Sequence, residues 1–404
     1  MSVINISHVV VILTLINFAF QLDFVILMPL GQSIMDQYQL TPVEFSSVVS
    51  VYTIASGIAS LVYSLLGAEF NKKMMLIFSI FLLGCSSFLT GMTSTFNELF
   101  FIRLFSGIFS GILNSLLFAL ATDHIPISRR GKAMAWILSG FSFASIFGVP
   151  LGLYLTDHYS FKLTYICIAM VFAIVMFMSI VILPNDQKSE KFHFNTMITH
   201  FGRCLKNTDY WKGYFLLFFV SGAIFVVVPL LSPFIIKNMK MKITNLEQMY
   251  LCGGILTVLI SRFIGMLCDK KGPKLILNIV GILSTIVVII FVNSGESSVV
   301  YFLLIGSLMI SMMSGLIVPS MTISSFFPSK EDSGVYNGIL NSVRSFGSGV
   351  FSYFAGIFIL TDPASGKFNN FDLVGIIYFA IITIVLLLNL MSPKRYAVPF
   401  DKIN

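Results

Sequence analysis

The chain has 404 residues, of which 56% are hydrophobic and only 11% are charged. Soluble domains carry about 25% charged residues, so this composition excludes an ordinary soluble protein and indicates a membrane protein. The net charge of +7 is better explained by the Lys and Arg that membrane proteins keep in cytoplasmic loops than by nucleic-acid binding, because no basic run is interleaved with aromatic residues.

Stretches of about 20 mostly apolar residues are long enough to cross a bilayer as helices. The sequence contains twelve of them, and most are separated by the Pro, Gly, Asn and Ser residues that are typical of turns. They cover residues 7–33, 43–67, 74–93, 98–121, 132–156, 163–183, 212–236, 246–268, 274–293, 297–321, 333–360 and 371–391. We therefore predict an all-α membrane protein with twelve transmembrane helices.

The Lys and Arg residues predict how these helices are oriented. With the N-terminus in the cytoplasm, the cytoplasmic segments hold seventeen Lys and Arg residues and the outer loops hold five. This bias follows the positive-inside rule, so both termini are expected on the cytoplasmic side of a bacterial-type inner membrane. The first apolar stretch has no basic region before it and no cleavage site after it, and is expected to be a retained span.

The longest polar segment, residues 184–211, lies between the sixth and seventh spans and is expected to be a central cytoplasmic loop. It separates an N-terminal half (1–183) from a C-terminal half (212–404), which ends in a short cytoplasmic tail. A weak repeat supports this division, because residues 24–30 read FVILMPL and residues 224–230 read IFVVVPL. Two similar six-helix halves are a transporter architecture.

Two charged residues, Asp23 in the first span and Arg103 in the fourth, are expected inside the bilayer, where an isolated charge is costly. The helical rise places Asp23 about 15 Å and Arg103 about 8 Å below the outer ends of their spans, a gap that an arginine can bridge. We predict that Arg103 pairs with Asp23 or with first-span carbonyls, and that Asp23 exchanges a proton during transport. The alternatives are a purely structural Asp and an arginine that extends to the outer surface.

Other polar residues are candidates for a central substrate cavity. Asn17 and Gln21 share one face of the first span, and Asp23 lies about 200° from Gln21, so we assign the first two to the cavity and Asp23 to the side of the fourth span. Asn114 in the fourth span is a further candidate. Arg344, at mid-depth in the eleventh span, is predicted to bind an anionic group, to balance an acid across the cavity or to contact a neighbouring helix carbonyl.

Small residues recur at helical spacing in the fourth and fifth spans. Such spacing lets helix backbones approach closely. The fourth span contains Arg103, Gly107 and Gly111, and the fifth contains Gly140, Gly148, Pro150 and Gly152. The loop after the eighth span includes Gly265, Asp269, Lys270, Gly272 and Lys274, and the loop after the second span holds Lys72 and Lys73.

These motifs resemble those of the major facilitator superfamily, and within it the drug:proton antiporter and arabinose-efflux-permease-like branch. Residues 265–274 are similar to the family's G-x-L-a-D-r-x-G-r-k loop, which the resemblance implies is a conformational switch. Its first-half copy is degraded, because Ala68 stands where the family has its Asp. The fourth-span and fifth-span glycines are similar to the family's R-x-x-x-G-x-x-x-G and antiporter motifs. The resemblance implies the twelve-helix major facilitator fold.

The resemblance further implies a secondary transporter that exports a small organic compound in exchange for protons by alternating access. Proton-coupled import of a sugar, an amino acid or another nutrient is one alternative, and a non-transporting membrane receptor with the same fold is another. No phosphate-binding loop, catalytic cluster or metal-ligand spacing occurs in the sequence. We therefore expect no enzyme activity, no cofactor and no metal. The expected partners are a small-molecule substrate, protons and the lipid bilayer, with the chain a monomer.

Overall fold

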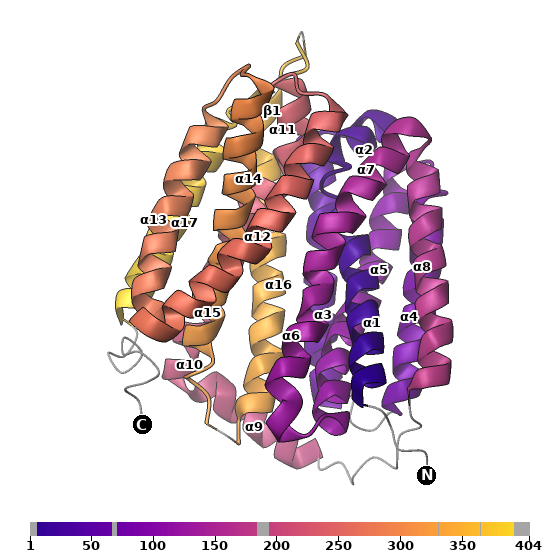
Figure 1. Ribbon diagram of the computed structural model, residues 1–404, viewed down its shortest axis with the longest axis vertical. Helices are drawn as coiled ribbons and strands as arrows, with labels where there is room; N and C mark the ends of the chain where they lie inside the picture. Colours follow the sequence, from indigo (N-terminus) through magenta and orange to yellow (C-terminus); the bar gives the residue numbers. More distant parts are fainter. Residues whose placement is uncertain (1–5, 67–70, 184–193, 330, 364, 392–404) are drawn as a thin grey trace.

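Long helices that run side by side form almost the whole molecule (Figure 1). The computed structural model describes residues 6–66, 71–183, 194–329, 331–363 and 365–391. One end of the bundle, here called the α9 end, holds α9 (Phe194–Lys206) and the start of α1 (Ile6–Ile26). The other, called the α11 end, holds α2 (Gly31–Tyr38) and α11 (Leu231–Lys237).

The remaining helices of the first half are α3 (Pro42–Leu66), α4 (Lys72–Thr90), α5 (Phe96–His124), α6 (Ile127–Phe143), the π-helical turn η2 (Ala144–Gly148), α7 (Val149–His158) and α8 (Phe161–Ile182). The second half contains α10 (Thr208–Val227), the 3-10 turn η3 (Val228–Leu230), α12 (Ile243–Lys271), α13 (Pro273–Val292), α14 (Val299–Gly315), α15 (Ile317–Ser324), α16 (Ser333–Phe358) and α17 (Asp372–Met391). Two short antiparallel strands, β1 (Leu360–Thr361) and β2 (Phe368–Asn369), are the exception to the all-α prediction.

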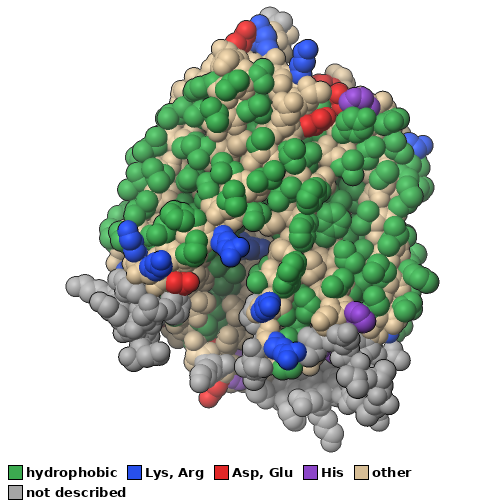
Figure 2. All heavy atoms as spheres, in the orientation of Figure 1, with side chains coloured by type: hydrophobic (Ala, Val, Ile, Leu, Met, Phe, Trp, Pro, Cys, Tyr) green, Lys and Arg blue, Asp and Glu red, His purple; other side chains and the backbone are tan. Residues whose placement is uncertain are grey.

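Each of the twelve predicted spans is occupied by helix. In the described part of the chain, eleven helical segments are both long and apolar enough to cross a membrane. The twelfth, α16, has 26 residues but is less apolar, because one of its faces carries Asn and Arg side chains. Apolar side chains cover most of the face shown in Figure 2, and several Lys and Arg side chains lie toward its α9 end. The chain is thus a multi-pass membrane protein.

The repeated FVILMPL and IFVVVPL segments mark a helix break in each half. The first span was predicted to run unbroken over residues 7–33, but α1 ends at Ile26 and α2 begins after a turn that contains Pro29. In the second half, η3 contains Pro229 and separates α10 from α11. A proline has no N–H for the helical hydrogen bond and its ring crowds the preceding turn, so both breaks follow from the sequence.

The two short helices after these breaks, α2 and α11, come together at the α11 end. A Cβ on Gly31 would lie 3.4 Å from Pro233, and Lys237 Nζ lies 4.0 Å from the Asp36 carboxylate. Deeper in the bundle, Phe24 stacks on Phe225 with 5.8 Å between ring centroids. The segments before and after the central loop are therefore in direct contact at this end.

Small residues also join α3 to α16. A Cβ on Gly356 of α16 would lie 2.7 Å from the Ser46 side chain of α3, and one on Gly57 of α3 would lie 3.0 Å from the Ser342 carbonyl of α16. The Ser352 hydroxyl donates to the Ser46 carbonyl at 3.3 Å. Small residues at these positions let the two backbones approach closely.

The central loop predicted over residues 184–211 contains more structure than expected. Its described part holds the whole of α9 and the first residues of α10, while residues 184–193 lie outside the described residues. In Figure 1, α9 crosses the end of the bundle below α3 and α16. Its polar contacts with the segment before α16 are part of the site described next.

Candidate functional site

The predicted ion pair between the first and fourth spans is present at the centre of the first half. Arg103 Nη1 of α5 lies 3.0 Å from Asp23 Oδ2 of α1 and donates a longer bond, 3.4 Å, to the Asp23 carbonyl. The Ser87 hydroxyl of α4 donates to Asp23 Oδ1 at 2.6 Å. Both charged side chains have no solvent exposure, so each ion depends on its partner for compensation.

The rest of the Arg103 guanidinium is less well satisfied. Its carbon lies 4.9 Å from the ring centroid of Tyr165 in α8, an arrangement that gives a cation–π attraction. Its Nε and Nη2 atoms are buried and have no hydrogen-bond partner among the described residues. Buried donors are normally paired, so this guanidinium retains the capacity to bind another acceptor.

Glycines place the helices that carry this pair. A Cβ on Gly107 or Gly111 of α5 would clash with carbonyl oxygens of α3, and one on Gly140 of α6 would lie 2.7 Å from a backbone nitrogen of α1. Gly148 and Gly152 likewise leave room for Leu22 and Ile26 of α1. The predicted close packing of the fourth and fifth spans is therefore present.

Pro150 lies just after the π-helical turn η2, near the start of α7. It cannot donate to the Ile146 carbonyl four residues earlier, and its ring crowds that carbonyl, which explains the widened turn before it. Ile146, within this turn, faces α12 of the second half, because a Cβ on Gly254 of α12 would lie 2.9 Å from its side chain. The fifth span thus packs on α1 with its glycines and meets the second half at its bend.

The predicted cavity residues do not all have similar surroundings. Asn17 is only 3% exposed, and its amide donates to the Ile137 carbonyl of α6 at 2.7 Å. It connects α1 to α6, whose backbone passes close to α1 at Gly140. Gln21 and Asn114 are half-buried and have no hydrogen bond to a described residue.

Arg344 lies on α16 between the faces that contact α3 and α10, nearer to the α10 face. Glycines at 349 and 356 contact α3, whereas Gly347 contacts the Phe218 carbonyl of α10. At 3.6 residues per turn, Asn341 and Ser348 lie between the two contact faces, and Arg344 lies about 60° from Gly347 on the side toward α10. Arg344 is half-buried, and its guanidinium has no ion pair with a described residue.

The loop after α12 contains the predicted turn. Gly272 has a φ of 86°, a conformation that favours glycine, and Pro273 begins α13. Asp269 and Lys270 are exposed, and no side chain caps α13. Pro273 has no N–H to cap and is suited to the first helical position.

Other residues near this loop and its first-half counterpart have defined partners. The Lys274 carbonyl of α13 accepts a 2.9 Å bond from Asn389 of α17, and a Cβ on Gly265 of α12 would meet nothing within 4 Å. In the first half, Lys72 pairs with Asp123 at 2.5 Å and Lys73 donates to the Leu183 carbonyl at 2.5 Å.

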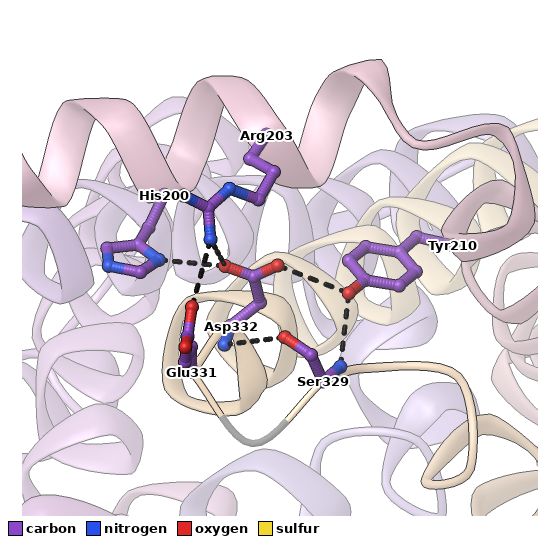
Figure 3. Close-up of polar contacts among 6 residues, drawn as sticks. All are labelled: His200, Arg203, Tyr210, Ser329, Glu331 and Asp332. Atoms are coloured by element: carbon purple, nitrogen blue, oxygen red, sulfur yellow. Dashed lines mark hydrogen bonds and ion pairs between the residues drawn. The ribbon is translucent and has the colours of Figure 1, made fainter.

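A polar cluster at the α9 end was not predicted (Figure 3). His200 Nδ1 lies 2.7 Å from Asp332 Oδ1, the Tyr210 hydroxyl donates to Asp332 Oδ2 at 3.2 Å, and Arg203 lies 3.5 Å from the same carboxylate. Burial raises the pKa of Asp332, but the bonds from His200 and Tyr210, the nearby Arg203 and a bond from Ser329 lower it more, so its pKa lies below the usual value.

The comparisons with known proteins agree with this geometry. The family model of the Major Facilitator Superfamily matches residues 13–352. A "Probable sugar efflux transporter" of Mannheimia succiniciproducens is 22% identical over 335 residues, which cover 82% of this chain and 83% of that protein. Multidrug resistance protein 3 of Bacillus subtilis is 27% identical over 117 residues, which cover 29% of this chain and 23% of that protein.

Solved structures share the fold at low identity. A bacterial homologue of the human lysosomal transporter Spinster, in an inward-facing and occupied conformation, has a TM-score of 0.76 and 13% identity and covers 98% of each chain. A mutant of the nucleoside transporter NupG has a TM-score of 0.75 and 12% identity, and covers 95% of this chain and 99% of that chain. The match to the family model along most of the sequence establishes that this chain, a transporter rather than an enzyme, belongs to the major facilitator superfamily.

Proposed function

We propose that the protein is a proton-coupled secondary transporter that exports a small organic compound by alternating access. The observation that carries this proposal is the buried pair of Asp23 and Arg103. A buried carboxylate stays ionised only while a cation compensates it, so movement of Arg103 away from Asp23 favours uptake of a proton by the acid. A cycle that alternately forms and separates this pair therefore binds and releases a proton.

Export is favoured over import by the likeness to the probable sugar efflux transporter and by the glycine and proline motif of the fifth span. We place both termini in the cytoplasm of an inner membrane, with the protein a monomer and residues 1–183 and 212–404 as its two moving halves. The contact of α2 with α11 then closes the outer end, and the substrate enters from the α9 end.

Gln21, Asn114 and Arg344 are the proposed substrate-binding residues. Their polar groups are half-buried and lack hydrogen-bonding side-chain partners in the described part of the chain, so water or a ligand must satisfy them. An arginine without an acid partner is costly inside a membrane protein, and an anionic ligand group would compensate it. Arg344 is therefore the residue proposed to bind a carboxylate or phosphate on the transported compound.

The first experiment identifies the ligand. Thermal unfolding of the purified protein is measured against a library that contains matched neutral and anionic compounds, such as glucose with gluconate and uridine with uridine monophosphate. Ligands that bind the native state raise the unfolding temperature. We expect anionic members to stabilise the wild-type protein and to lose most of that effect in Arg344→Gln, while Arg344→Lys retains part. Equal stabilisation of Arg344→Gln would contradict the assignment of Arg344.

The second experiment tests the coupling in proteoliposomes that contain this ligand. We expect Asp23→Asn to abolish transport driven by an imposed pH gradient and to leave ligand exchange, which needs no net proton movement. Asp209→Asn, which removes an exposed acid from the start of α10, is the matched control and should behave as the wild type. If Asp23→Asn responds fully to the gradient, another acid carries the proton.

A further inference from the structure

A groove of about 850 Å³ lies between α1 and α6, apart from the proposed substrate residues. Val11, Leu15 and Phe18 of α1 form one wall, and Trp136 and Phe143 of α6 form the other. Three of these side chains are exposed, Val11 at 52%, Trp136 at 55% and Phe143 at 39%, and the other two are half-buried. The groove is thus an open apolar depression rather than a filled helix interface.

The groove faces the membrane and not the centre of the protein. Phe24 of α1 points toward the second half, because it stacks on Phe225 of α10. At 3.6 residues per turn, Val11 lies about 140° and Leu15 about 180° from Phe24 around the helix, whereas Thr14 and Val10, at about 80° and 40°, line the inner edge of the groove. In Figure 1, the lower part of α1 is visible from outside between α6 and α8, and Figure 2 shows the apolar surface hollowed in this region.

The end of the groove nearest α9 is basic. Arg129 and Lys132 of α6 line it there, both are exposed, and neither forms an ion pair with a described residue. From Lys132 to Phe147, at the far end, the helix rises about 22 Å, which exceeds the roughly 15 Å depth of one hydrocarbon leaflet. Two cations therefore lie at one end of an apolar groove that is long enough to hold a lipid acyl chain.

We infer that this groove binds a phospholipid with an anionic headgroup from the leaflet at the α9 end. The headgroup phosphate lies against Arg129 and Lys132, and an acyl chain lies along Val11, Trp136 and Phe147. Basic pockets between membrane helices bind anionic headgroups in this way, and a tryptophan is well suited to the boundary between headgroups and chains. Charge complementarity is what selects an anionic lipid over a zwitterionic one.

The experiment uses Trp136 as its own reporter. The chain has two tryptophans, so Trp211→Phe leaves only Trp136 to fluoresce. This full-length variant is reconstituted in phosphatidylcholine vesicles that contain a small, equal fraction of brominated phosphatidylglycerol or brominated phosphatidylcholine, whose bromines quench nearby tryptophans. We expect stronger quenching by the anionic lipid. Substituting Arg129→Gln or Lys132→Gln should lower the preference by about fivefold each, and both together should remove it.

Two controls make the result decisive. Arg262→Gln with Lys270→Gln removes the same charge from α12, also toward the α9 end, and should leave the preference of Trp136 unchanged. Glycerol 3-phosphate should not relieve the quenching, and relief by it would assign the cations to a soluble anion instead. Equal quenching by both lipids, or a preference that survives Arg129→Gln with Lys132→Gln, would overturn the inference.

Discussion

The buried pair makes a prediction about stability that needs no knowledge of the substrate. Breaking a buried ion pair by removing one partner costs about 3–5 kcal/mol, because the remaining charge is left uncompensated. Asn at position 23 still offers an oxygen to the Ser87 hydroxyl, so the loss in Asp23→Asn comes mainly from the stranded Arg103. An arginine remains protonated at any accessible pH. We therefore expect Asp23→Asn to lower the free energy of unfolding by about 3–5 kcal/mol.

Removing the arginine instead of the acid should lower the free energy of unfolding by less. In Arg103→Gln the stranded group is Asp23, which can take up a proton and become neutral, so its destabilisation should shrink as the pH falls. The double variant strands no charge. It should be more stable than Asp23→Asn alone, with a coupling energy of at least about 2 kcal/mol between the two positions.

This cycle can be measured by reversible unfolding in mixed detergent micelles, followed by circular dichroism. The exposed pair of Lys212 and Asp209, whose atoms lie 2.7 Å apart, is the matched control and should give a coupling of only about 0–0.5 kcal/mol. Losses at Asp23 and Arg103 that add to within about 0.5 kcal/mol would refute the reasoning, since independent sites behave in that way.

Three further predictions follow from the packing, the α9 cluster and the charges. Gly111→Ala should destabilise the protein by about 1–3 kcal/mol because its Cβ clashes with α3, whereas Gly265→Ala, whose Cβ meets nothing within 4 Å, should be nearly neutral in the same unfolding assay. The lowered pKa of Asp332 stabilises the fold above about pH 4, and this stabilisation is lost as the pH falls through the lowered pKa; the stability difference from Asp332→Asn should therefore disappear in acid. Reporter fusions should place Asn185 in the cytoplasm and Asp157 outside, and the reverse result would invert the proposed topology.

The sequence was most informative where apolar length or intramembrane charge dominates. Eleven of the predicted spans match described helices that are long and apolar enough to cross a membrane, because a bilayer requires about 20 apolar residues for each. The pairing of Asp23 with Arg103 could be predicted from depth, because two opposite charges at similar levels in hydrocarbon have strong reason to meet. The contacts of Ser87 and Tyr165 with this pair could not be predicted, since a single hydroxyl or aromatic residue in an apolar helix does not indicate which neighbour it faces.

The remaining differences between prediction and structure have two causes: the direction in which a side chain points around its helix axis, and contacts between residues that lie far apart in the sequence. Asn17 was assigned to the cavity from its position on the face of Gln21, but small residues of α6 bring the Ile137 carbonyl within reach of its amide. The cluster around Asp332 joins residues more than 120 positions apart, so no local spacing could indicate it. The His, Arg and Tyr residues of this polar segment are typical of a solvated surface, and only the fold brings Asp332 next to them.

The contact between α3 and α16 has a consequence for how fast the halves can move. Where two helices pack through large interdigitated side chains, movement of one helix along the other requires each side chain to change its packing. The activation enthalpy of that movement is therefore high. At the contact between α3 and α16 the side chains are small instead, at Gly57, Gly356, Ser46 and Ser352. We therefore expect the two helices to change their crossing angle at these positions with few side-chain rearrangements. The turnover rate should then depend only weakly on temperature, and a single bulky side chain in this seam should stop the motion while each half still folds.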